Sequence, residues 1–264
     1  KPDVLIPSSY CSPIIKWFET VSKTYDIPML LIDLPFVHDD MSPDDINRST
    51  RYMRAQLDDL IALIERLTGR KFNYDKLQQN VEITGEMGKL WEKILRLSKH
   101  EPAPTSCFDM FVNLFPVTCM RGNIQGVDYY KQLQAELTYR IEQGISYIPH
   151  EKYRLYWDNL PIWYKMRDLS NEFASYDANI VAAMYPFCFC FTYDAPDPMG
   201  SLNSIAEILT LGINNRSVQQ RADFITQLVK DYSIDGLVMQ STRTCKYMCL
   251  GQQDIIEAVE KETG

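Results

Sequence analysis

Two short apolar runs near the N-terminus flank a stretch with helical spacing. Residues 3–7 form the first run and residues 27–33 the second, while Trp17, Phe18 and Val21 between them fall on one face of a helix. The second run is apolar at successive positions rather than at alternate ones. That pattern is typical of a strand buried on both faces of a parallel sheet. The sequence therefore predicts a β-α-β unit at this end of the chain.

The pattern then becomes helical over residues 42–150. Ser42 is a good N-cap, Pro43 suits the first helical position, and a helix starting there is predicted to end at Gly69. Further helices are predicted over residues 73–97 and 125–143. Because this block contains no convincing strand, we predict a helical subdomain.

Strands and helices alternate again from residue 151. Strands are predicted over residues 154–157, 179–185 and 237–240, separated by stretches with helical periodicity. The chain is thus predicted to be α/β, with a parallel-sheet domain at 1–41, the helical subdomain at 42–150 and a second parallel-sheet domain at 151–264. The first and last elements lie at the very ends, so we expect the first domain to be truncated at its N-terminus and the second at its C-terminus.

Cysteines close two similar turns, each where a predicted strand gives way to a helix. Cys11 ends a serine-rich turn after the first strand, and Cys245 ends a small, polar turn after the last one. This position exposes a thiol at the carboxyl edge of a sheet, near helix N-terminal amides that favour a thiolate or a bound anion. Thiolates of this kind hold iron-sulfur clusters. The alternative is a small buried residue at a tight turn.

Charge and composition exclude several classes of protein. The net charge of -8 disfavours nucleic-acid binding, and no apolar run approaches the ~20 residues that a membrane span requires. Without a signal-peptide pattern, we predict a cytoplasmic protein. The seven cysteines are an odd number and include no C-x-x-C pair, which argues against a disulfide framework and a zinc knuckle.

Several segments resemble the 2-hydroxyacyl-CoA dehydratase and benzoyl-CoA reductase family. The matching segments are residues 2–11, 16–19, 27–36, 235–246, 251–254 and 263–264. Residues 154–163 are also similar to a family segment, which usually has glycine where this chain has Asn159. The helical middle matches in layout rather than in motif.

The resemblance implies two Rossmann- or flavodoxin-like domains whose facing edges hold a [4Fe-4S] cluster on three cysteines. It also implies a homologous second subunit in a heterodimer, an ATP-dependent [4Fe-4S] activator protein and an acyl-CoA substrate. Carried over to this sequence, it makes Cys11 and Cys245 metal ligands, and it places the third cysteine upstream of Lys1. We expect the two sulfur atoms to lie within roughly 6 to 7 Å of each other, as ligands of one cubane cluster.

Other residues are candidates for substrate contacts and proton transfer. The two turns carry the possible donors Ser8, Ser9, Ser241, Thr242 and Arg243. Trp157, Trp163 and Tyr185 are candidates to line an acyl or CoA pocket, and His38 is a candidate proton carrier. The alternatives are turn residues that bond their own backbone, aromatic residues of the core and a surface histidine.

The remaining cysteines are predicted to be structural. Cys107 and Cys119 are predicted to pack in the core, and Cys188 and Cys190 to share one face of an extended segment. Cys249 follows Cys245 by one helical turn, but the family pattern has no ligand there, so a non-ligand is expected.

Four functions remain open at this point. The leading hypothesis is an iron-sulfur subunit of an (R)-2-hydroxyacyl-CoA dehydratase, which removes water through a ketyl radical to give a 2-enoyl-CoA. An ATP-dependent benzoyl-CoA reductase subunit shares the same motifs. A non-catalytic, cluster-bearing partner subunit and a flavodoxin-like binding domain that uses neither cysteine are the other two.

Overall fold

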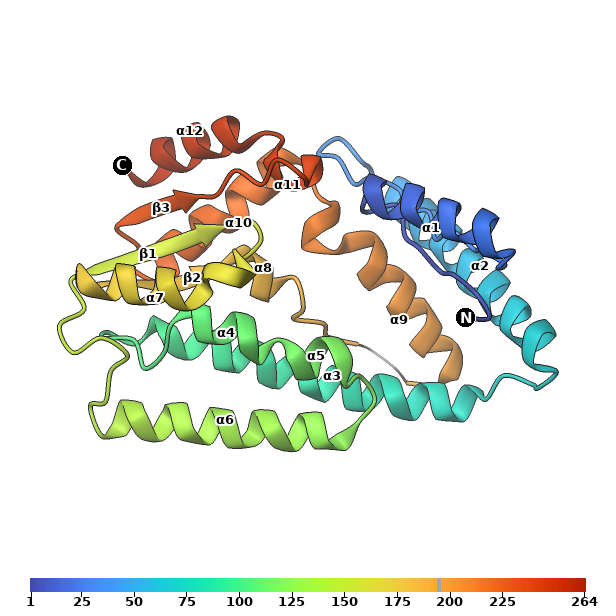
Figure 1. The fold of residues 1–264 in the computed structure, drawn as a ribbon, viewed down its shortest axis with the longest axis horizontal. Helices are drawn as coiled ribbons and strands as arrows, with labels where there is room; N and C mark the ends of the chain where they lie inside the picture. The colour runs from blue at the N-terminus through green and yellow to red at the C-terminus, as the bar shows by residue number, and fades with distance from the viewer. Residues whose placement is uncertain (194–195) are drawn as a thin grey trace. The chain divides into compact units, whose positions relative to one another are not determined.

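The computed structural model describes residues 1–193 and 196–264, which form two compact units. Unit 1 comprises Lys1–Gln79 and Tyr193–Ser217, and unit 2 comprises Asn80–Thr192 and Val218–Gly264. Figure 1 shows the path of the chain, coloured along its length. Each unit is built from two stretches of chain that are distant in sequence, so each is described by itself.

Unit 1 contains the predicted β-α-β unit only as isolated bridges, and the prediction that residues 27–33 form a strand buried on both faces was wrong, because only Ile27 and Ile32 of this run are buried. Leu5 pairs with Met29 and Ser8 with Ile32, both in parallel, and helix α1 (Ser12–Tyr25) connects the two segments. Pro7 lies within the first segment and accepts a hydrogen bond from the amide of Ile32 at 2.9 Å. Because proline has no N–H to donate, the pairing stays limited to isolated bridges.

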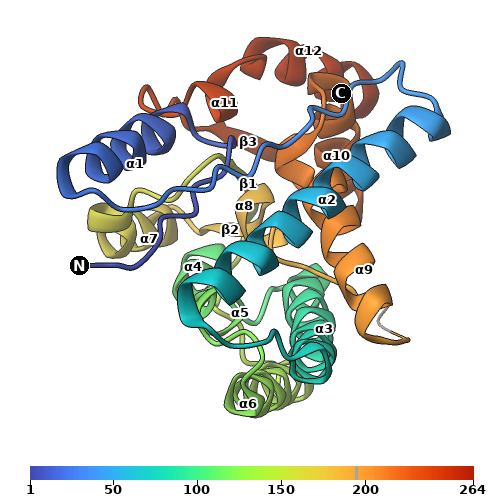
Figure 2. The ribbon, with the colours of Figure 1, turned by 90° about the vertical axis from the view of Figure 1, so that its right-hand side faces the viewer.

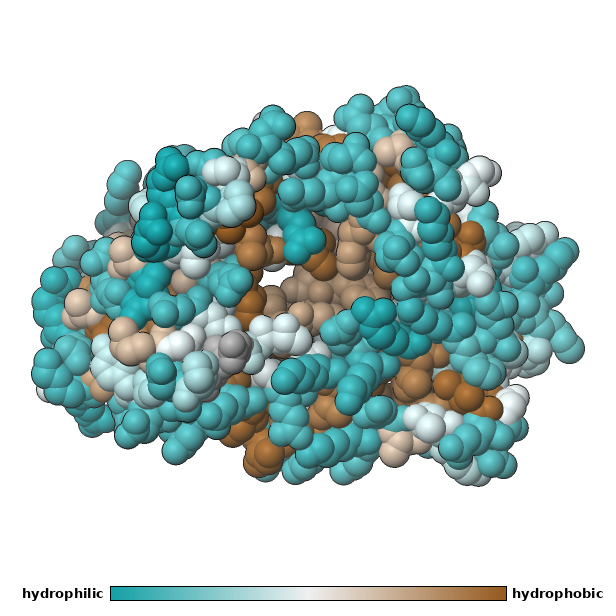
Figure 3. Space-filling model, turned by 180° about the vertical axis from the view of Figure 1, so that it is seen from behind, coloured by the Kyte–Doolittle hydropathy of each residue, from teal (hydrophilic) through white to brown (hydrophobic). Residues whose placement is uncertain are grey.

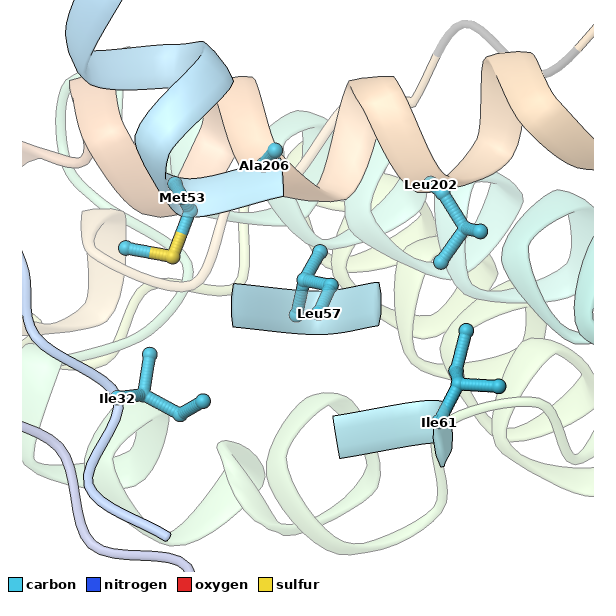
Figure 4. Packing of buried hydrophobic residues seen from close by; sticks show 6 residues of the cluster. All are labelled: Ile32, Met53, Leu57, Ile61, Leu202 and Ala206. Atoms are coloured by element: carbon cyan, nitrogen blue, oxygen red, sulfur yellow. The ribbon is translucent and has the colours of Figure 1, made fainter. Parts of the chain in front are cut away.

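The core of unit 1 forms where α2 (Pro43–Thr68) packs against α9 (Pro198–Leu211). Helix α2 begins with a capping box between Ser42 and Asp45 and ends at Gly69 in a left-handed conformation, so the predicted helix is confirmed. Figure 4 shows side chains of both helices directed toward one another and toward the second β segment. The residues in this cluster are Ile32, Met53, Leu57, Ile61, Leu202 and Ala206.

Unit 2 is built around a three-stranded parallel sheet in the order β2-β1-β3. The strands are β1 (Tyr153–Asp158), β2 (Ala178–Ala183) and β3 (Gly236–Met239), and all six residues of β2 are buried. The strands are parallel, as the alternation of strands and helices in this part of the sequence predicted, and β2 is buried on both faces. The chain is a mixed α/β protein.

Helices connect and cover the sheet of unit 2. Helix α7 (Met166–Ser175) joins β1 to β2, while α10 (Val218–Asp231) and α12 (Gln252–Thr263) precede and follow β3 and pack against each other. The short α11 (Lys246–Cys249) lies between β3 and α12. The carboxyl ends of β1 and β3 therefore lead into the turns that hold Asn159 and Cys245.

The predicted helices over residues 73–97 and 125–143 are confirmed as α3 (Tyr74–Arg96) and α6 (Ile124–Glu142). These two helices run alongside each other in both ribbon views (Figures 1 and 2). Trp91 of α3 stacks on Tyr130 of α6 with ring centroids 5.2 Å apart. Two short helices between them are α4 (Cys107–Asn113) and α5 (Phe115–Cys119). Within residues 42–150, all of which the structure describes, no strand is present.

The predicted strand over residues 179–185 is too long. Strand β2 ends at Ala183, and the chain turns at once into α8 (Met184–Phe187). The amide of Cys188 donates to the carbonyl of Met184 at 3.2 Å, so Cys188 closes a helical turn. The prediction that Cys188 and Cys190 share one face of an extended segment was therefore wrong.

The surface is mainly hydrophilic on the face drawn in Figure 3, where hydrophobic residues occur in small groups. Among the helices of the described residues, none combines the length and apolar character that crossing a bilayer demands.

Candidate functional site

Cys11 occupies the N-cap position of α1. Its backbone is extended (φ -133°, ψ 106°), its carbonyl accepts from the amide of Ile15 at 3.2 Å, and its side chain makes no capping hydrogen bond. Pro13 in the first turn favours a helix start at this point. The free thiol is partly exposed. It is therefore available to a ligand beside the N-terminus of a helix.

The residues just before Cys11 fix its turn to the rest of unit 1. The Ser9 Oγ accepts a hydrogen bond from the amide of Leu34 at 2.8 Å, and the Tyr10 hydroxyl donates to the carbonyl of Leu209 at 3.2 Å. Ser8 pairs with Ile32. Ser9 thus bonds the backbone of a segment 25 residues away rather than that of its own turn, and its role as a donor to a substrate stays a prediction.

Cys245 lies between β3 and α11 in unit 2, also at a helix start. Its amide donates to the carbonyl of Thr242 at 3.0 Å, and its own carbonyl accepts from the amide of Cys249 at 3.2 Å. The Cys245 thiol is free and partly exposed, and Ser241 and Arg243 in the same turn are exposed. Three of the predicted site residues therefore share one accessible turn.

Cys249 faces this turn rather than an open position. Its thiol donates to the carbonyl of Thr242 and accepts from the Asn159 Nδ2 at 3.7 Å. A thiol engaged on both sides in this way fits a structural residue, as expected for Cys249.

Two buried polar residues lie where β1 ends, near the start of the Cys245 turn. Asp158 and Asn159 are both fully buried. The Asn159 Nδ2 donates to the carbonyl of Gln240 at 3.1 Å, and the Gln252 Nε2 donates to the same carbonyl at 3.0 Å and to Asp158 at 3.2 Å. Asn159 has φ +76°, a conformation that glycine adopts most easily and asparagine tolerates.

Asp158 is held in this network as a buried carboxyl group. Burial raises the pKa of Asp158 above its usual range, while a hydrogen bond from Gln252 and the charge of Arg221 act in the opposite direction. The buried Arg221 guanidinium also donates to the carbonyl of Met248 at 3.3 Å. Asn159 and Arg221 therefore contact the segment that follows Cys245, while Gln252 contacts Gln240 before it.

Sequence reasoning missed Asp158, Gln252 and Arg221 as supports of this turn. The available signal was a polar pair, Asp158 and Asn159, at the end of an otherwise apolar strand. A buried strand end with two polar residues needs hydrogen-bond partners from elsewhere. The sequence does not show that these partners come from α10 and α12.

The predicted aromatic residues fall into two environments. Trp157 is buried, its Nε1 donates to the carbonyl of Leu160 at 3.2 Å, and it packs edge-on against Phe108. In contrast, Trp163 is 54% exposed and lies edge-on to Tyr185 with ring centroids 6.5 Å apart. The structure therefore brings Trp163 and Tyr185 together and places Trp157 in the core.

His38 is exposed in the turn before α2. The preceding loop is fixed by Asn215, whose Nδ2 donates to the carbonyl of Pro35 at 2.7 Å and whose carbonyl accepts from the amide of Val37 at 3.3 Å. The His38 imidazole is thus accessible at the end of an anchored loop.

The two cysteines of the helical middle differ in burial. Cys107 is buried, and this burial strongly raises the pKa of its thiol, so the packing prediction is confirmed. Cys119 is exposed, so the same prediction was wrong for it. The reason is that the single-turn α5 buries only Pro116 and Val117.

Over residues 1–264 the chain matches the family described as 2-hydroxyglutaryl-CoA dehydratase, D-component. The chain belongs to this family. The resemblance carried by the cysteine turns is thereby confirmed.

Among individual relatives, the chain is 30% identical to the (R)-phenyllactyl-CoA dehydratase alpha subunit of Clostridium sporogenes, over all of this chain and 63% of that protein. It is 28% identical to the alpha subunit of (R)-2-hydroxyglutaryl-CoA dehydratase of Acidaminococcus fermentans, over 93% of this chain and 50% of that protein. It is also 27% identical to a subunit of the benzoyl-CoA reductase of Thauera aromatica, over all of this chain and 63% of that protein. The chain thus spans between half and two thirds of the length of these relatives.

The dehydratase family is generally associated with iron-sulfur clusters, and the residues of this chain fit such a group in part. Cys11 and Cys245 offer free, partly exposed thiols, which is the donor chemistry that iron requires. Among the residues that the structure describes, however, no three His, Cys, Asp or Glu side chains are grouped to hold a metal ion. Cys11 belongs to unit 1 and Cys245 to unit 2, and each unit is described by itself, so the expected distance between the two sulfur atoms stays a prediction.

Proposed function

We propose that the chain is part of the iron-sulfur subunit of an (R)-2-hydroxyacyl-CoA dehydratase, which removes water from its substrate to give a 2-enoyl-CoA. The observation that carries this proposal is the family match over all 264 residues. It is supported by the two cysteines of the family motifs, both of which are free, partly exposed and directly before a helix.

In this proposal Cys11 and Cys245 are two ligands of a [4Fe-4S] cluster, and a third cysteine comes from outside the residues described. The parallel-sheet portions at 1–41 and 151–264 belong to two Rossmann-like domains, with residues 42–150 as a helical subdomain. The parallel bridges of unit 1 and the parallel sheet of unit 2 support this organisation.

The bound cluster would supply one electron to the thioester, and the resulting ketyl radical makes the β-hydrogen acidic and lets the α-hydroxyl leave. The chain itself has to hold the substrate in place for this chemistry. Ser241 and Arg243 are exposed in the Cys245 turn and are suited to donate hydrogen bonds to the thioester and hydroxyl oxygens. Trp163 and Tyr185 are suited to cover the acyl chain and exclude water, with the buried Trp157 supporting them through the aromatic core.

The proton from the β-carbon needs an acceptor, which we assign to a ring nitrogen of the exposed His38. The electron returns at the end of the cycle, so the net reaction is the loss of water. The family resemblance adds an ATP-dependent [4Fe-4S] activator protein as the source of the first electron and a homologous second subunit. A cytoplasmic location completes the proposal. Both dehydratase relatives described above are named alpha subunits, which supports a partner subunit.

A second candidate is a subunit of an ATP-dependent benzoyl-CoA reductase. The similarity to the Thauera aromatica benzoyl-CoA reductase over the whole chain favours it. A third is a non-catalytic, cluster-bearing partner subunit that shares the two cysteine turns.

The test is anaerobic purification of the full-length protein with its partner and activator, followed by parallel assays with (R)-2-hydroxyacyl-CoA and benzoyl-CoA. ATP-dependent formation of the 2-enoyl-CoA is the expected result, and omission of the activator is the control. Turnover of benzoyl-CoA alone would replace the proposal with the second candidate. Turnover of neither substrate at full iron content would favour the non-catalytic subunit.

A further inference from the structure

We propose that Asn159 and Gln252 are positioning residues that set the conformation of the Cys245 turn through one shared backbone carbonyl. The inference rests on the proposed function to the extent that Cys245 is a cluster ligand. It concerns residues that belong to neither cysteine turn and that contact no predicted ligand directly.

The shared group is the carbonyl of Gln240, just after β3 ends. It accepts from the Asn159 Nδ2 at 3.1 Å and from the Gln252 Nε2 at 3.0 Å, so both lone pairs of this oxygen are used. Asn159 follows β1 and Gln252 opens α12, so two different elements meet at this oxygen. The carbonyl lies five residues before Cys245, where the turn starts.

The orientation of the Asn159 amide is determined by its own neighbour. Its Oδ1 accepts from the amide of Leu160 at 2.8 Å, which directs its Nδ2 toward the Gln240 carbonyl and the Cys249 sulfur. The φ of +76° would suit glycine as well, but glycine has no amide to donate. The left-handed backbone and the amide donor are therefore separable contributions of this residue.

Cys249 links Asn159 to the backbone of the Cys245 turn. Its thiol donates to the carbonyl of Thr242, which also accepts from the amide of Cys245, while the Cys249 amide donates to the Cys245 carbonyl. Asn159 contacts the same sulfur. A continuous set of hydrogen bonds thus leads from Asn159 to both backbone polar groups of Cys245.

Gln252 is positioned in turn by Asp158, which accepts from its Nε2 at 3.2 Å and from the hydroxyl of Tyr156 at 3.2 Å. Asp158 and Tyr156 are fully buried, so the support does not depend on solvent. Loss of such outer partners typically weakens metal binding even when every ligand is present.

The test uses Asn159→Gly and Gln252→Ala in the full-length protein. Asn159→Gly keeps the left-handed backbone and removes the amide, and Gln252→Ala removes the second donor to Gln240. The matched controls are Asp177→Gly, at another left-handed and exposed residue of unit 2, and Gln253→Ala, at the exposed neighbour of Gln252. If Asn159→Gly fails to fold, Asn159→Asp, which replaces the donor by an acceptor at the same size, takes its place.

Three readouts follow the Cys245 turn without relying on activity. We expect iodoacetamide to alkylate Cys245 in the metal-free protein about fivefold faster in both variants, since each loses one hydrogen bond that holds the turn. Iron should be lost to a chelator about tenfold faster from the reconstituted protein. The EPR spectrum of the reduced cluster should shift in both variants and in neither control.

The outcomes separate this inference from the proposed function. If Cys245→Ala keeps its full iron content, Cys245 is not a ligand and the proposed function fails, while the alkylation rates still test the positioning role. If Cys245→Ala loses iron but Asn159→Gly and Gln252→Ala match their controls in all three readouts, the inference is overturned. Equal effects from the controls would likewise overturn it.

Discussion

The two cysteine turns have the same local plan and are held in different ways. Cys11 precedes a helix of 14 residues and Cys245 a helix of only four. The Cys11 turn is fixed by side chains of its own residues, since Ser9 accepts from the amide of Leu34 and Tyr10 donates to the carbonyl of Leu209. The Cys245 turn is fixed by buried side chains from other elements, among them Asn159.

This difference shows what each turn requires. A helix of several turns offers aligned backbone amides at its N-terminus, whereas a single turn offers few. The Cys245 turn compensates with side-chain amides that hold its carbonyl groups. Substitution of side chains outside the turn should therefore change the conformation of the Cys245 turn more than that of the Cys11 turn.

The largest effect is expected from removal of either cysteine. If the proposed function holds, Cys11→Ala and Cys245→Ala should each lower the proposed ATP-dependent dehydratase activity by more than about 100-fold, beyond what loss of an outer partner causes. Iron per polypeptide should fall in parallel. Cys119→Ala, at an exposed thiol, should retain both iron and activity. Full iron content in Cys11→Ala or in Cys245→Ala would remove that residue from the ligand set.

Two glycines, one close to each cysteine turn, allow a matched comparison of substitutions to alanine. Gly251 has φ +77°, and a Cβ added there would lie 2.5 Å from the Val218 Cγ2, whereas a Cβ at Gly212 would lie 3.2 Å from the Tyr10 hydroxyl without a strained φ. Gly251→Ala should therefore lower the free energy of unfolding by about 3 kcal/mol. Gly212→Ala should lower it by less than about 1 kcal/mol. Urea denaturation measures both, and equal effects would contradict the comparison.

A smaller effect is expected from Tyr10→Phe, which removes the hydrogen bond to the Leu209 carbonyl. Unit 1 should lose about 1 kcal/mol of stability. Tyr164→Phe, at a side chain that is 87% exposed, serves as the control and should change stability by less than about 0.5 kcal/mol. A change of stability confined to unit 2 would argue against an anchoring role for Tyr10.

The smallest effect is expected from the pH dependence of Asp158→Asn. Because burial raises the pKa of Asp158, the folded protein keeps a proton that the unfolded chain releases near its ordinary pKa of about 3.9. The free energy of unfolding of the wild type therefore falls as the pH rises from the pKa of Asp158 in the unfolded chain to its pKa in the folded protein. Asp158→Asn has no carboxyl group at this position and lacks this pH dependence.

The free energy of unfolding of Asp158→Asn, relative to the wild type, should thus increase between about pH 4 and neutral pH. Urea titrations across that range measure it. Asp177→Asn, at an exposed aspartate of the same unit, is the control. A difference between Asp158→Asn and the wild type that stays constant over this pH range would show that the carboxyl group of Asp158 is not perturbed in the folded state.

Strong local patterns in the sequence predicted much of the fold. Ser42 and Pro43 located the start of α2, and the alternation of strands and helices after residue 151 indicated a parallel sheet. The prediction extended β2 too far because Met184 and Tyr185 are apolar, and a short apolar run does not distinguish a strand from one turn of helix. Only the tertiary context settles such a boundary.

The site was predicted less completely than the fold. Cys11 and Cys245 stand at helix starts as the sequence indicates, because a strand followed by a small polar turn is a local signal. The support from Gln252 depends on contacts between segments about 94 residues apart, since it reaches Asp158. No periodicity in the sequence encodes a contact between two such distant segments. The sequence shows only that the polar end of a buried strand requires hydrogen-bond partners.

The interleaving of the two units has a consequence for folding during synthesis. The core of unit 1 needs Leu202 and Ala206 of α9, which leave the ribosome only after residues 80–192 have been made. The apolar face of α2 is therefore exposed on the nascent chain while residues 80–192 of unit 2 are translated. Since closing such a long loop is entropically unfavourable, this face is where chaperones would be expected to bind the nascent chain.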